Sequence, residues 1–399
     1  MKKILLLQIT MLGFVYSIYA QADTSFNIWM WTTGSHVLHD GKRLENYGFT
    51  LGRGTPNIPG PVLRVKEGQK VKLEVRNQSQ GAPHTIHLHG LDVDQANDGV
   101  PLTSWDIKHK ETKDYNFVAT HPGTYLYHCH VASVLHVQLG MYGSLIVEPK
   151  SKEAAPGYPY QRDFNLLLSE ADKSWFDNKP KHATGDSVHA QFYIPKYEPD
   201  YFFVNGQSQH LIDSLIMGVS ESVLLRLSNV GYYENQVRFP QGLTAKLMSS
   251  DGRPLPQKDV IDTLLISPGE RYGVLLSPIG KTRGVIEIDY LHLFTREVIQ
   301  TEKVPYGFDT TLSIQAVQNF KDIKIFPNPA KDFIRINYPV SENVVVTLVS
   351  ASGQQYETKG TKMDDSMEFD IRHLPAGNYV MQLWVDNKLQ GTRNVVKVE

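Results

Sequence analysis

The residues with the clearest capacity for chemistry are histidines grouped around the only cysteine of the chain. Cys129 lies between His128 and His130, and it is followed by His136 and Met141. The segment that leads into Cys129 predicts a β-strand, in which successive side chains point to opposite faces. The two neighbouring histidines are therefore expected on one face, and the thiol on the other.

A second histidine group, in residues 83–90, shows the same division. His87 and His89 share a face, whereas His84 lies an odd number of residues away and belongs to the opposite face of a regular strand. Alternation alone thus predicts two sets of ligands. The first set combines imidazole, thiolate and thioether donors, namely His84, Cys129, His136 and Met141, and the second holds imidazoles alone, namely His87, His89, His128 and His130.

The first set has the donor chemistry of a blue-copper electron-transfer site, with two histidines, one cysteine and a weak axial methionine. The second set suits copper or zinc and could face a substrate such as dioxygen. Cys129 is bonded in sequence to a histidine on each side, which gives electrons a short covalent path between the sets. A single histidine is usually a surface or core residue, but eight of the 15 histidines fall within residues 84–136. This grouping favours a metal site, and copper over zinc.

Length and composition limit the class of protein. A chain of 399 residues predicts two or three domains. Many short alternating runs rich in tyrosine, valine, threonine and glycine predict an all-β chain. The formal net charge of −2 argues against a surface that binds nucleic acid or another polyanion.

The N-terminus has the features of a signal peptide over residues 1–22. Two lysines precede a mostly apolar segment at residues 4–19, and Ala20-Gln21-Ala22 forms a cleavage site of small residues. The mature chain is therefore expected to begin near Asp23. No other segment is long and apolar enough to cross a bilayer. An exported chain with one cysteine has no internal disulfide, and copper ligation would protect that thiol from oxidation.

Residues 23–150 are expected to form a copper-binding domain with a Greek-key sandwich fold, because short strand-like runs alternate with turns throughout. Five of its segments, in order, resemble the cupredoxin domain of multicopper oxidases. They are Ile-Pro-Gly-Pro at 58–61, His-Thr-Ile-His-Leu-His-Gly at 84–90, Asp-Gly-Val-Pro at 98–101, Pro-Gly-Thr-Tyr-Leu-Tyr-His-Cys-His at 122–130 and His-Val-Gln-Leu-Gly-Met at 136–141.

The resemblance implies a role for each ligand. The first set would bind type 1 copper, and the second set would supply half the ligands of a type 2/type 3 trinuclear cluster. Asp98 resembles the acidic residue that relays protons to that cluster, although an Asp-Gly pair is equally typical of a turn. The spacing from Cys129 to His136 is longer than in three-domain laccases and closer to the two-domain, nitrite-reductase-like branch.

A linker at residues 151–160 precedes a second cupredoxin-like domain, expected at residues 161–305. Its Phe-Val-Asn-Gly at 203–206 and Ile-Ser-Pro-Gly-Glu-Arg-Tyr-Gly at 266–273 resemble the copper-free middle domain of multicopper oxidases. Residues 235–239 read Asn-Gln-Val-Arg-Phe where a copper-bearing domain would offer a His-x-His pair. A trinuclear cluster needs eight imidazoles and four are found, so the others must come from another subunit or chain, or the cluster is incomplete.

Residues 322–399 are expected to form a small C-terminal β-sandwich. The Phe-Pro-Asn-Pro run at 326–329 and the Gly-Asn-Tyr run at 377–379 resemble the C-terminal sorting domain of the type IX secretion system. The resemblance implies passage through the periplasm and across the outer membrane, followed by release or surface attachment. The alternative is a plain accessory sandwich.

Together these features predict two cupredoxin-like sandwiches and a sorting domain in an exported copper oxidoreductase of the multicopper oxidase type. A small-molecule or metal-ion donor would give single electrons to the type 1 copper, and the imidazole site would reduce oxygen. A homotrimer is an option because trimers occur in two-domain relatives. The alternatives are a nitrite-reductase-like enzyme and a copper-binding or electron-transfer protein without turnover.

Overall fold

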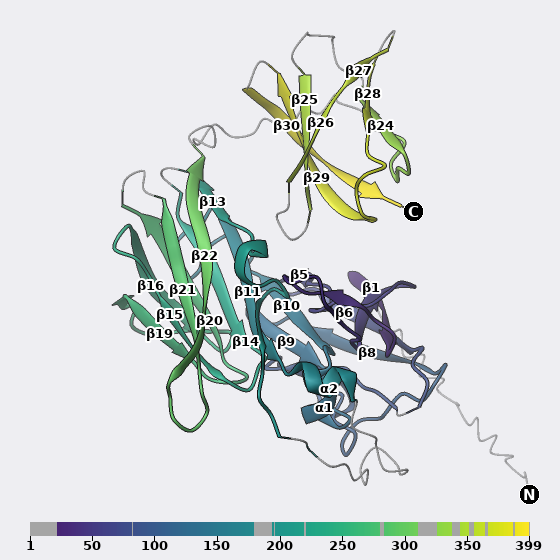
Figure 1. The fold of residues 1–399 in the computed structure, drawn as a ribbon, viewed down its shortest axis with the longest axis vertical. Helices are drawn as coiled ribbons and strands as arrows, with labels where there is room; N and C mark the ends of the chain where they lie inside the picture. Colours follow the sequence, from purple (N-terminus) through teal and green to yellow (C-terminus); the bar gives the residue numbers. More distant parts are fainter. Residues whose placement is uncertain are drawn as a thin grey trace, which may run out of the picture.

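The computed structural model describes residues 22–81, 83–178, 194, 196–218, 221–279, 283–309, 325–336, 344–350, 355–363, 366–385 and 388–398. The expected signal peptide lies outside these residues, apart from its last position. The described chain is almost entirely β, as the sequence predicted, and it forms three successive pairs of sheets (Figure 1). Among the described residues, no helix has the length and apolar character needed to cross a membrane.

The first sandwich packs two four-stranded sheets around a core of its own. One sheet has the order β4 (Gly48–Leu51), β1 (Thr24–Trp31), β6 (Lys70–Asn77) and β8 (Thr112–Val118). The other has the order β5 (Leu63–Lys66), β10 (Tyr142–Glu148), β9 (Gly123–His128) and β7 (His87–His89). A small pair, β2 (His36–Val37) and β3 (Arg43–Leu44), and two short helices, η1 (Gln95–Asn97) and α1 (Ser133–Gln138), lie in its connections.

Strand β6 shows why these residues form a half-buried strand. Val71, Leu73 and Val75 are at most 2% exposed, whereas Lys72 and Glu74 between them are more exposed. Strict alternation of apolar and polar side chains matches the two-residue repeat of a strand. Each buried aliphatic side chain contributes roughly 1.5–3 kcal/mol, which fixes the face that the strand presents to the core.

The second sandwich repeats this architecture with longer strands. One sheet has the order β12 (Tyr201–Val204), β11 (Arg162–Ala171), β14 (Val223–Asn229), β20 (Arg271–Pro278), β16 (Leu243–Ser250) and β17 (Arg253–Pro254), and β18 (Val260–Ile261) also pairs with β16. The other has the order β13 (Leu215–Gly218), β22 (Val298–Asp309), β21 (Gly284–Leu291), β15 (Glu234–Arg238) and β19 (Thr263–Ile266). Helices α2 (Lys173–Asp177) and η2 (Gln209–Leu211) lie in its connections.

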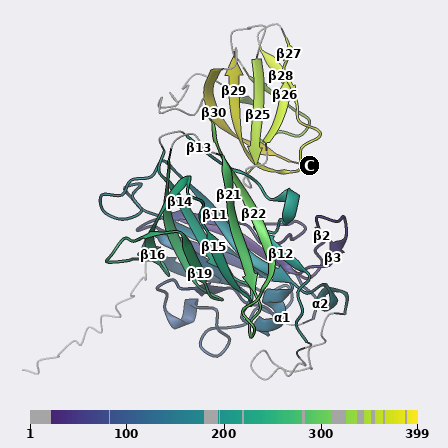
Figure 2. The same ribbon diagram turned by 60° about the vertical axis from the view of Figure 1, so that its left-hand side comes forward.

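The third sandwich consists of two four-stranded sheets that enclose a separate small core. One sheet has the order β23 (Ile325–Phe326), β24 (Phe333–Ile336), β28 (Met367–Asp370) and β27 (Thr361–Lys362). The other has the order β26 (Gln355–Lys359), β25 (Val344–Ser350), β29 (Gly377–Val385) and β30 (Lys388–Lys397). Both ribbon views show it as a distinct body beyond one end of the second sandwich (Figures 1 and 2). The three sandwiches follow the expected order of segments, and the segment boundaries themselves stay predictions.

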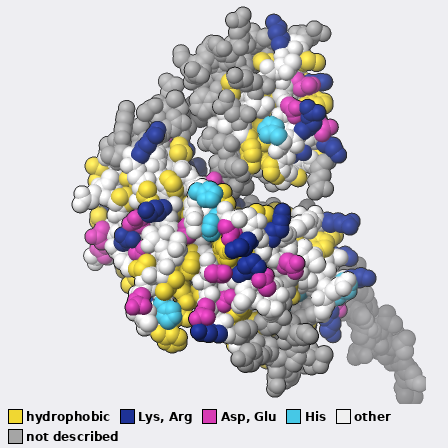
Figure 3. Space-filling model, viewed as in Figure 1, with side chains coloured by type: hydrophobic (Ala, Val, Ile, Leu, Met, Phe, Trp, Pro, Cys, Tyr) yellow, Lys and Arg dark blue, Asp and Glu magenta, His cyan; other side chains and the backbone are white. Residues whose placement is uncertain are grey.

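The first and second sandwiches share a hydrophobic cluster at their junction. Ile58, Leu139 and Tyr142 of the first contact Leu167 and Phe203 of the second within this cluster. The junction places α1 against the second sandwich (Figure 2). On the face seen in Figure 3, positive and negative side chains are interspersed, in keeping with the small net charge.

Candidate metal centre

The first ligand set is assembled where β9 and β10 run side by side, beyond the last residue of β9. His128 pairs with Tyr142 in the register of these strands, and the Cys129 amide donates to the Met141 carbonyl over 3.1 Å. Helix α1 fills the connection between the two strands and carries His136. The Met141 amide in turn donates to the His136 carbonyl over 2.9 Å, so these three residues form one compact backbone unit.

The first set lies in a pocket closed to water. His84, Cys129, His136 and Met141 are each at most 1% exposed. The Cys129 Sγ lies 3.3 Å from His136 Nδ1 and 3.6 Å from His84 Nδ1. Three ligands at roughly 2.0–2.3 Å from one ion are separated by roughly 3.3–3.8 Å, so these spacings fit a shared metal ion.

Burial also sets the protonation of the first set. It raises the pKa of the Cys129 thiol to about 11, because a thiolate is poorly solvated in this pocket. A bound cation reverses that preference, since metal binding displaces the thiol proton. A soft thiolate with two imidazoles in a dry cavity is the donor set that suits copper. The residues present therefore fit the metal that the sequence predicted.

The second ligand set lies on the opposite face of the same strands. His87 of β7 pairs directly with His128 of β9, and His89 is two residues further along β7. His89 Nδ1 lies 3.3 Å from His128 Nε2, and ligand atoms of these three histidines lie within 4.8 Å of one another. The ring of His130 lies 5.1 Å from that of His87. Thus the structure brings the eight predicted residues together as two groups, as alternation predicted, and their metal-binding roles stay predictions.

Three imidazoles of the second set have a lowered pKa. Burial lowers the pKa of His128 to about 3, and burial together with the Arg271 charge lowers that of His89 to about 4. Burial also lowers the pKa of His130. Because metal ions bind the neutral ring, these imidazoles are ready to act as ligands from mildly acidic pH upward.

Backbone carbonyl groups orient two of these rings. His87 Nδ1 donates to the Asp98 carbonyl over 2.8 Å, and His128 Nδ1 lies 3.0 Å from the Cys129 carbonyl. In each case the bond engages Nδ1 and leaves Nε2 as the ligand atom. Such partners fix the tautomer and direction of a metal-binding histidine.

The position of Asp98 is consistent with both interpretations of its motif, as a proton-relay residue and as a turn residue. Its carboxylate lies 3.3 Å from His87 Nδ1, with the side chain 30% exposed, so it touches both the second set and solvent. Gly99 follows with φ of +76°, and a Cβ there would collide with the Ile86 carbonyl, so the turn requires glycine. By contrast, Asp92 pairs with Arg253 and His121, and Asp94 caps η1.

The second sandwich offers no replacement ligands from β15. Asn235 is fully buried between β19 and β21, and Arg238 pairs with Asp289 and Glu287. Within the described residues, the only groups of three or more candidate ligands are the two in the first sandwich. His210 and His292 belong to neither, while His182 and His189 lie outside the described residues.

Sequence reasoning missed the charge of Arg271, which lowers the pKa of His89 in the second set. Its guanidinium packs against Gly90, where a Cβ would collide with it, and a Cβ on Gly269 would lie 3.2 Å from the His89 ring. Arg271 is buried, pairs with Asp251 at 2.8 Å and donates to the Gly269 carbonyl. The run at 266–273 marked a domain motif, but no spacing in the sequence relates it to His89.

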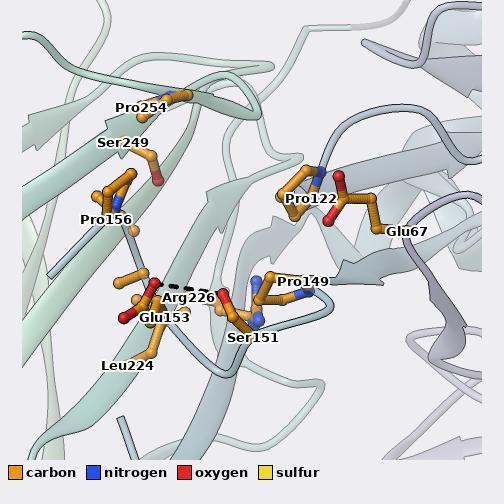
Figure 4. Close-up of a pocket in the computed structure, with 14 residues that line it drawn as sticks. Glu67, Pro122, Pro149, Ser151, Glu153, Pro156, Leu224, Arg226, Ser249 and Pro254 are labelled. Atoms are coloured by element: carbon orange, nitrogen blue, oxygen red, sulfur yellow. Dashed lines mark hydrogen bonds between the residues drawn. The ribbon is translucent and has the colours of Figure 1, made fainter. Parts of the chain in front are cut away.

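A cavity of about 180 Å³ lies at the junction of the two sandwiches and contains none of the eight candidate ligands. Figure 4 shows Pro122 and Glu67 on one side, with Leu224 and Ser249 on the other. Arg226 at its wall is held by Asp163. This cavity is therefore separate from the candidate metal centre.

Comparison with known proteins gives two family matches. Residues 55–152 match the multicopper oxidase model, and residues 324–398 match the model of a secretion system C-terminal sorting domain. The chain is 29% identical over 262 residues to a copper resistance protein A homolog of Pseudomonas syringae pv. tomato, over 55% of this chain and 43% of that protein. It is 36% identical over 179 residues to the copper-containing nitrite reductase of Neisseria gonorrhoeae, over 44% and 43% respectively.

The fold is similar to that of a blue copper oxidase from Nitrosomonas europaea. The TM-score is 0.60 at 28% identity, over 71% of this chain and 86% of that chain. The chain spans less than half the length of the curated relatives it matches.

Proposed function

Because the chain carries a multicopper oxidase domain followed by a secretion-system sorting domain, we propose that it is an exported copper-dependent oxidoreductase. It would take single electrons from a reductant at the first ligand set and pass them to the second set, where oxygen is reduced. One observation carries this proposal. Cys129 lies in the first set, and its two neighbours in the chain, His128 and His130, lie in the second.

The first set would hold the copper that receives electrons. His84, Cys129 and His136 offer three strong donors, and Met141 is buried beside them as the weak axial donor. Copper supplies one-electron redox chemistry in both sets. The closed pocket excludes water from the thiolate and holds the ligands in place, so that little movement accompanies a change of oxidation state.

The second set would hold the copper at which oxygen reacts. Its imidazoles are partly exposed, in contrast to the buried first set, so a small acceptor has access to them. The rings of His87 and His128 are hydrogen-bonded through Nδ1, which leaves Nε2 free to act as the ligand atom. The chain thereby separates a dry electron-entry site from an open reaction site.

Asp98 would bring protons to the second set, because oxygen reduction consumes one proton for each electron on the way to water. Its carboxylate contacts the His87 ring and is partly open to solvent. A carboxyl group in that position can take a proton from water and hold it beside the site. The backbone carbonyl of the same residue keeps His87 in place while the side chain exchanges protons.

The match to a sorting domain and the expected signal peptide support a location of this chemistry outside the inner membrane. We propose passage through the periplasm, recognition of the third sandwich by type IX secretion machinery, and release or surface attachment. The reductant would be a small molecule or a metal ion that gives single electrons to the first set.

A nitrite-reductase-like activity is the second candidate. The similarity to a copper-containing nitrite reductase supports it, as does a second set of four histidines, three of them with ligand atoms within 4.8 Å of one another, where a trinuclear cluster needs eight. Copper content and acceptor use separate the candidates. The mature protein would be loaded with copper, analysed for copper per chain and mass, and supplied with a one-electron donor together with either oxygen or nitrite.

We expect more than one copper per chain and oxygen uptake. Nitrite reduction without oxygen uptake would replace the proposal with the second candidate. A single copper per chain with neither activity would indicate an electron carrier. The mass of the native assembly in the same experiment tests whether the chain forms a homotrimer.

A further inference from the structure

Helix α1 carries His136, yet it is poorly suited to hold that residue by itself. It has six residues, and isolated helices below about 12 residues are marginal in water. Its N-cap is Ala132, with φ of 44° and no capping side chain. The position of His136 must therefore depend on contacts that α1 makes with the rest of the protein.

The second sandwich supplies two such contacts through tyrosine hydroxyl groups. Tyr232 Oη donates to the carbonyl of Val134, and Gln138 Nε2 donates to Tyr197 Oη over 2.8 Å. Val134 and Gln138 lie two residues before and two residues after His136. The two hydrogen bonds thus hold the helix on either side of the ligand.

A buried carboxylate organises these tyrosines. Glu170 of β11 is 3% exposed, and its Oε1 accepts hydrogen bonds from the Tyr197 hydroxyl over 2.9 Å, from the Tyr233 amide over 3.1 Å and from the Tyr232 amide. A Cβ on Gly231 would collide with the carboxylate, so the backbone there closes directly over it. The rings of Tyr197 and Tyr232 pack edge to face at 5.1 Å.

Burial of a charged carboxylate at this junction costs free energy. Burial raises the pKa of Glu170 to about 7, and its Oε2 has no hydrogen-bond partner among the described residues. A network of this kind fixes geometry more than it adds stability, because Glu170 Oε1 can accept its three hydrogen bonds in only one arrangement of the tyrosines. Its members connect β11, the residues after β14 and the segment before β12 to α1.

We propose that Glu170, Tyr197 and Tyr232 form a clamp that positions α1 and so sets the distance between His136 and Cys129. The copper-free second sandwich would then act on the first ligand set without contributing a ligand. The three residues are positioning residues. The inference rests on the proposed function only in taking His84, Cys129 and His136 as copper ligands.

Movement of α1 would reach the first set directly. His136 Nδ1 lies 3.3 Å from Cys129 Sγ, and the Met141 amide donates a hydrogen bond to the His136 carbonyl, so two residues of the first set would follow the helix. The strength of the copper–thiolate interaction depends on this geometry. Loosening the clamp should therefore alter the colour and the reduction potential of the site.

The test uses Tyr232→Phe and Tyr197→Phe in the full chain, each of which removes one hydroxyl and keeps the ring. Tyr233→Phe is the matched control, because its hydroxyl forms no hydrogen bond with a described residue although its ring lies in the same cluster. The measurements on copper-loaded protein are the thiolate-to-copper absorption band, the reduction potential and the rate of copper loss to a chelator.

We expect both clamp variants to shift the band and the potential and to lose copper roughly twofold to tenfold faster, the range for one lost hydrogen bond. The control should match the parent protein. Unchanged spectra, potential and copper retention in both clamp variants would overturn the proposal, as would equal changes in Tyr233→Phe. If Tyr232→Phe does not fold, the measurements on Tyr197→Phe alone decide whether the proposal holds.

None of these readouts requires turnover. A parent protein that is blue but reduces no oxygen would contradict the proposed function and leave the clamp open to the same measurement. A parent protein without a thiolate-to-copper band would instead remove the ligand assignment on which the clamp acts.

Discussion

His84 and His136 direct their Nδ1 atoms at each other across 3.2 Å, although 52 residues separate them in the chain. One comes from the segment before β7 and the other from α1. The Cys129 sulfur lies within 3.6 Å of both nitrogens. Three strong donors thus converge from three different elements, which makes the site sensitive to each of them separately.

Replacement of the sulfur should remove the first site. Cys129→Ser exchanges a soft thiolate for a hydroxyl of similar size, so we expect loss of the intense blue absorption and of turnover, with an unchanged all-β circular dichroism spectrum. Absorption and activity of copper-loaded protein check this. A serine variant that stays blue and active would rule out Cys129 as the ligand.

The axial residue should tune the site. Met141 is fully buried, and a leucine of similar volume should cost less than about 1.5 kcal/mol of stability. Loss of the weak sulfur donor removes a contact that stabilises Cu(II), so Met141→Leu should keep copper and raise the reduction potential. Voltammetry measures it. An unchanged potential would argue against an axial role for Met141.

The two ligand sets should be separable by mutation. Replacing His87 and His89 together by alanine should lower turnover more than roughly hundredfold and leave the blue band intact, because both residues lie in the second set. His121→Ala is a suitable control, since that side chain is half exposed and pairs with Asp92 at the surface. Loss of colour in the double variant would show that the sets are not independent.

Glu170 should make stability depend on pH. Its pKa rises from 4.5 to about 7 on folding, because burial disfavours the charged form. Its contribution is thus complete below pH 4.5 and lost as pH rises through about 7. Between pH 6 and pH 8 the loss is on the order of 1 kcal/mol.

Urea unfolding of the parent protein and of Glu170→Gln across this range isolates the effect. The glutamine variant cannot ionise at this position, so its stability should fall by less over the same interval. Parallel curves for the two proteins would mean that the carboxyl group is not protonated preferentially in the folded state.

Processing should remove both ends of the chain. We expect the exported protein to begin near Asp23 and to end before about Asp322, because of the expected cleavage site and the sorting domain. Intact mass of protein taken from the native cell surface or medium measures both termini. Recovery of the chain with its third sandwich attached, and only in the periplasm, would contradict the sorting role.

Local sequence pattern predicted the features that depend on strand geometry. The opposite faces of Cys129 and His128 follow from a two-residue repeat, which is a property of the backbone. The match of residues 324–398 to a sorting domain was likewise carried by short motifs. Such features need no knowledge of distant contacts.

Features that depend on packing between sandwiches could not be predicted in this way. Tyr232 reaches Val134 across 98 residues, and Arg271 packs on Gly90 with no shared motif. The six residues of α1 also escaped prediction, because so short a helix has no recognisable periodicity. Asp98 remained ambiguous in sequence because a turn residue and a proton carrier can be the same side chain.

The alternation of His128, Cys129 and His130 has a consequence for how this protein can change over evolutionary time. One inserted or deleted residue ahead of Cys129 would exchange the faces of the strand, and each metal site would receive the side chains meant for the other. A substitution in this segment changes one ligand set and leaves the other in place. An insertion or deletion changes both sets in a single step. We therefore expect the residues between the ligands to tolerate substitution, whereas the length of the segment is constrained by both ligand sets.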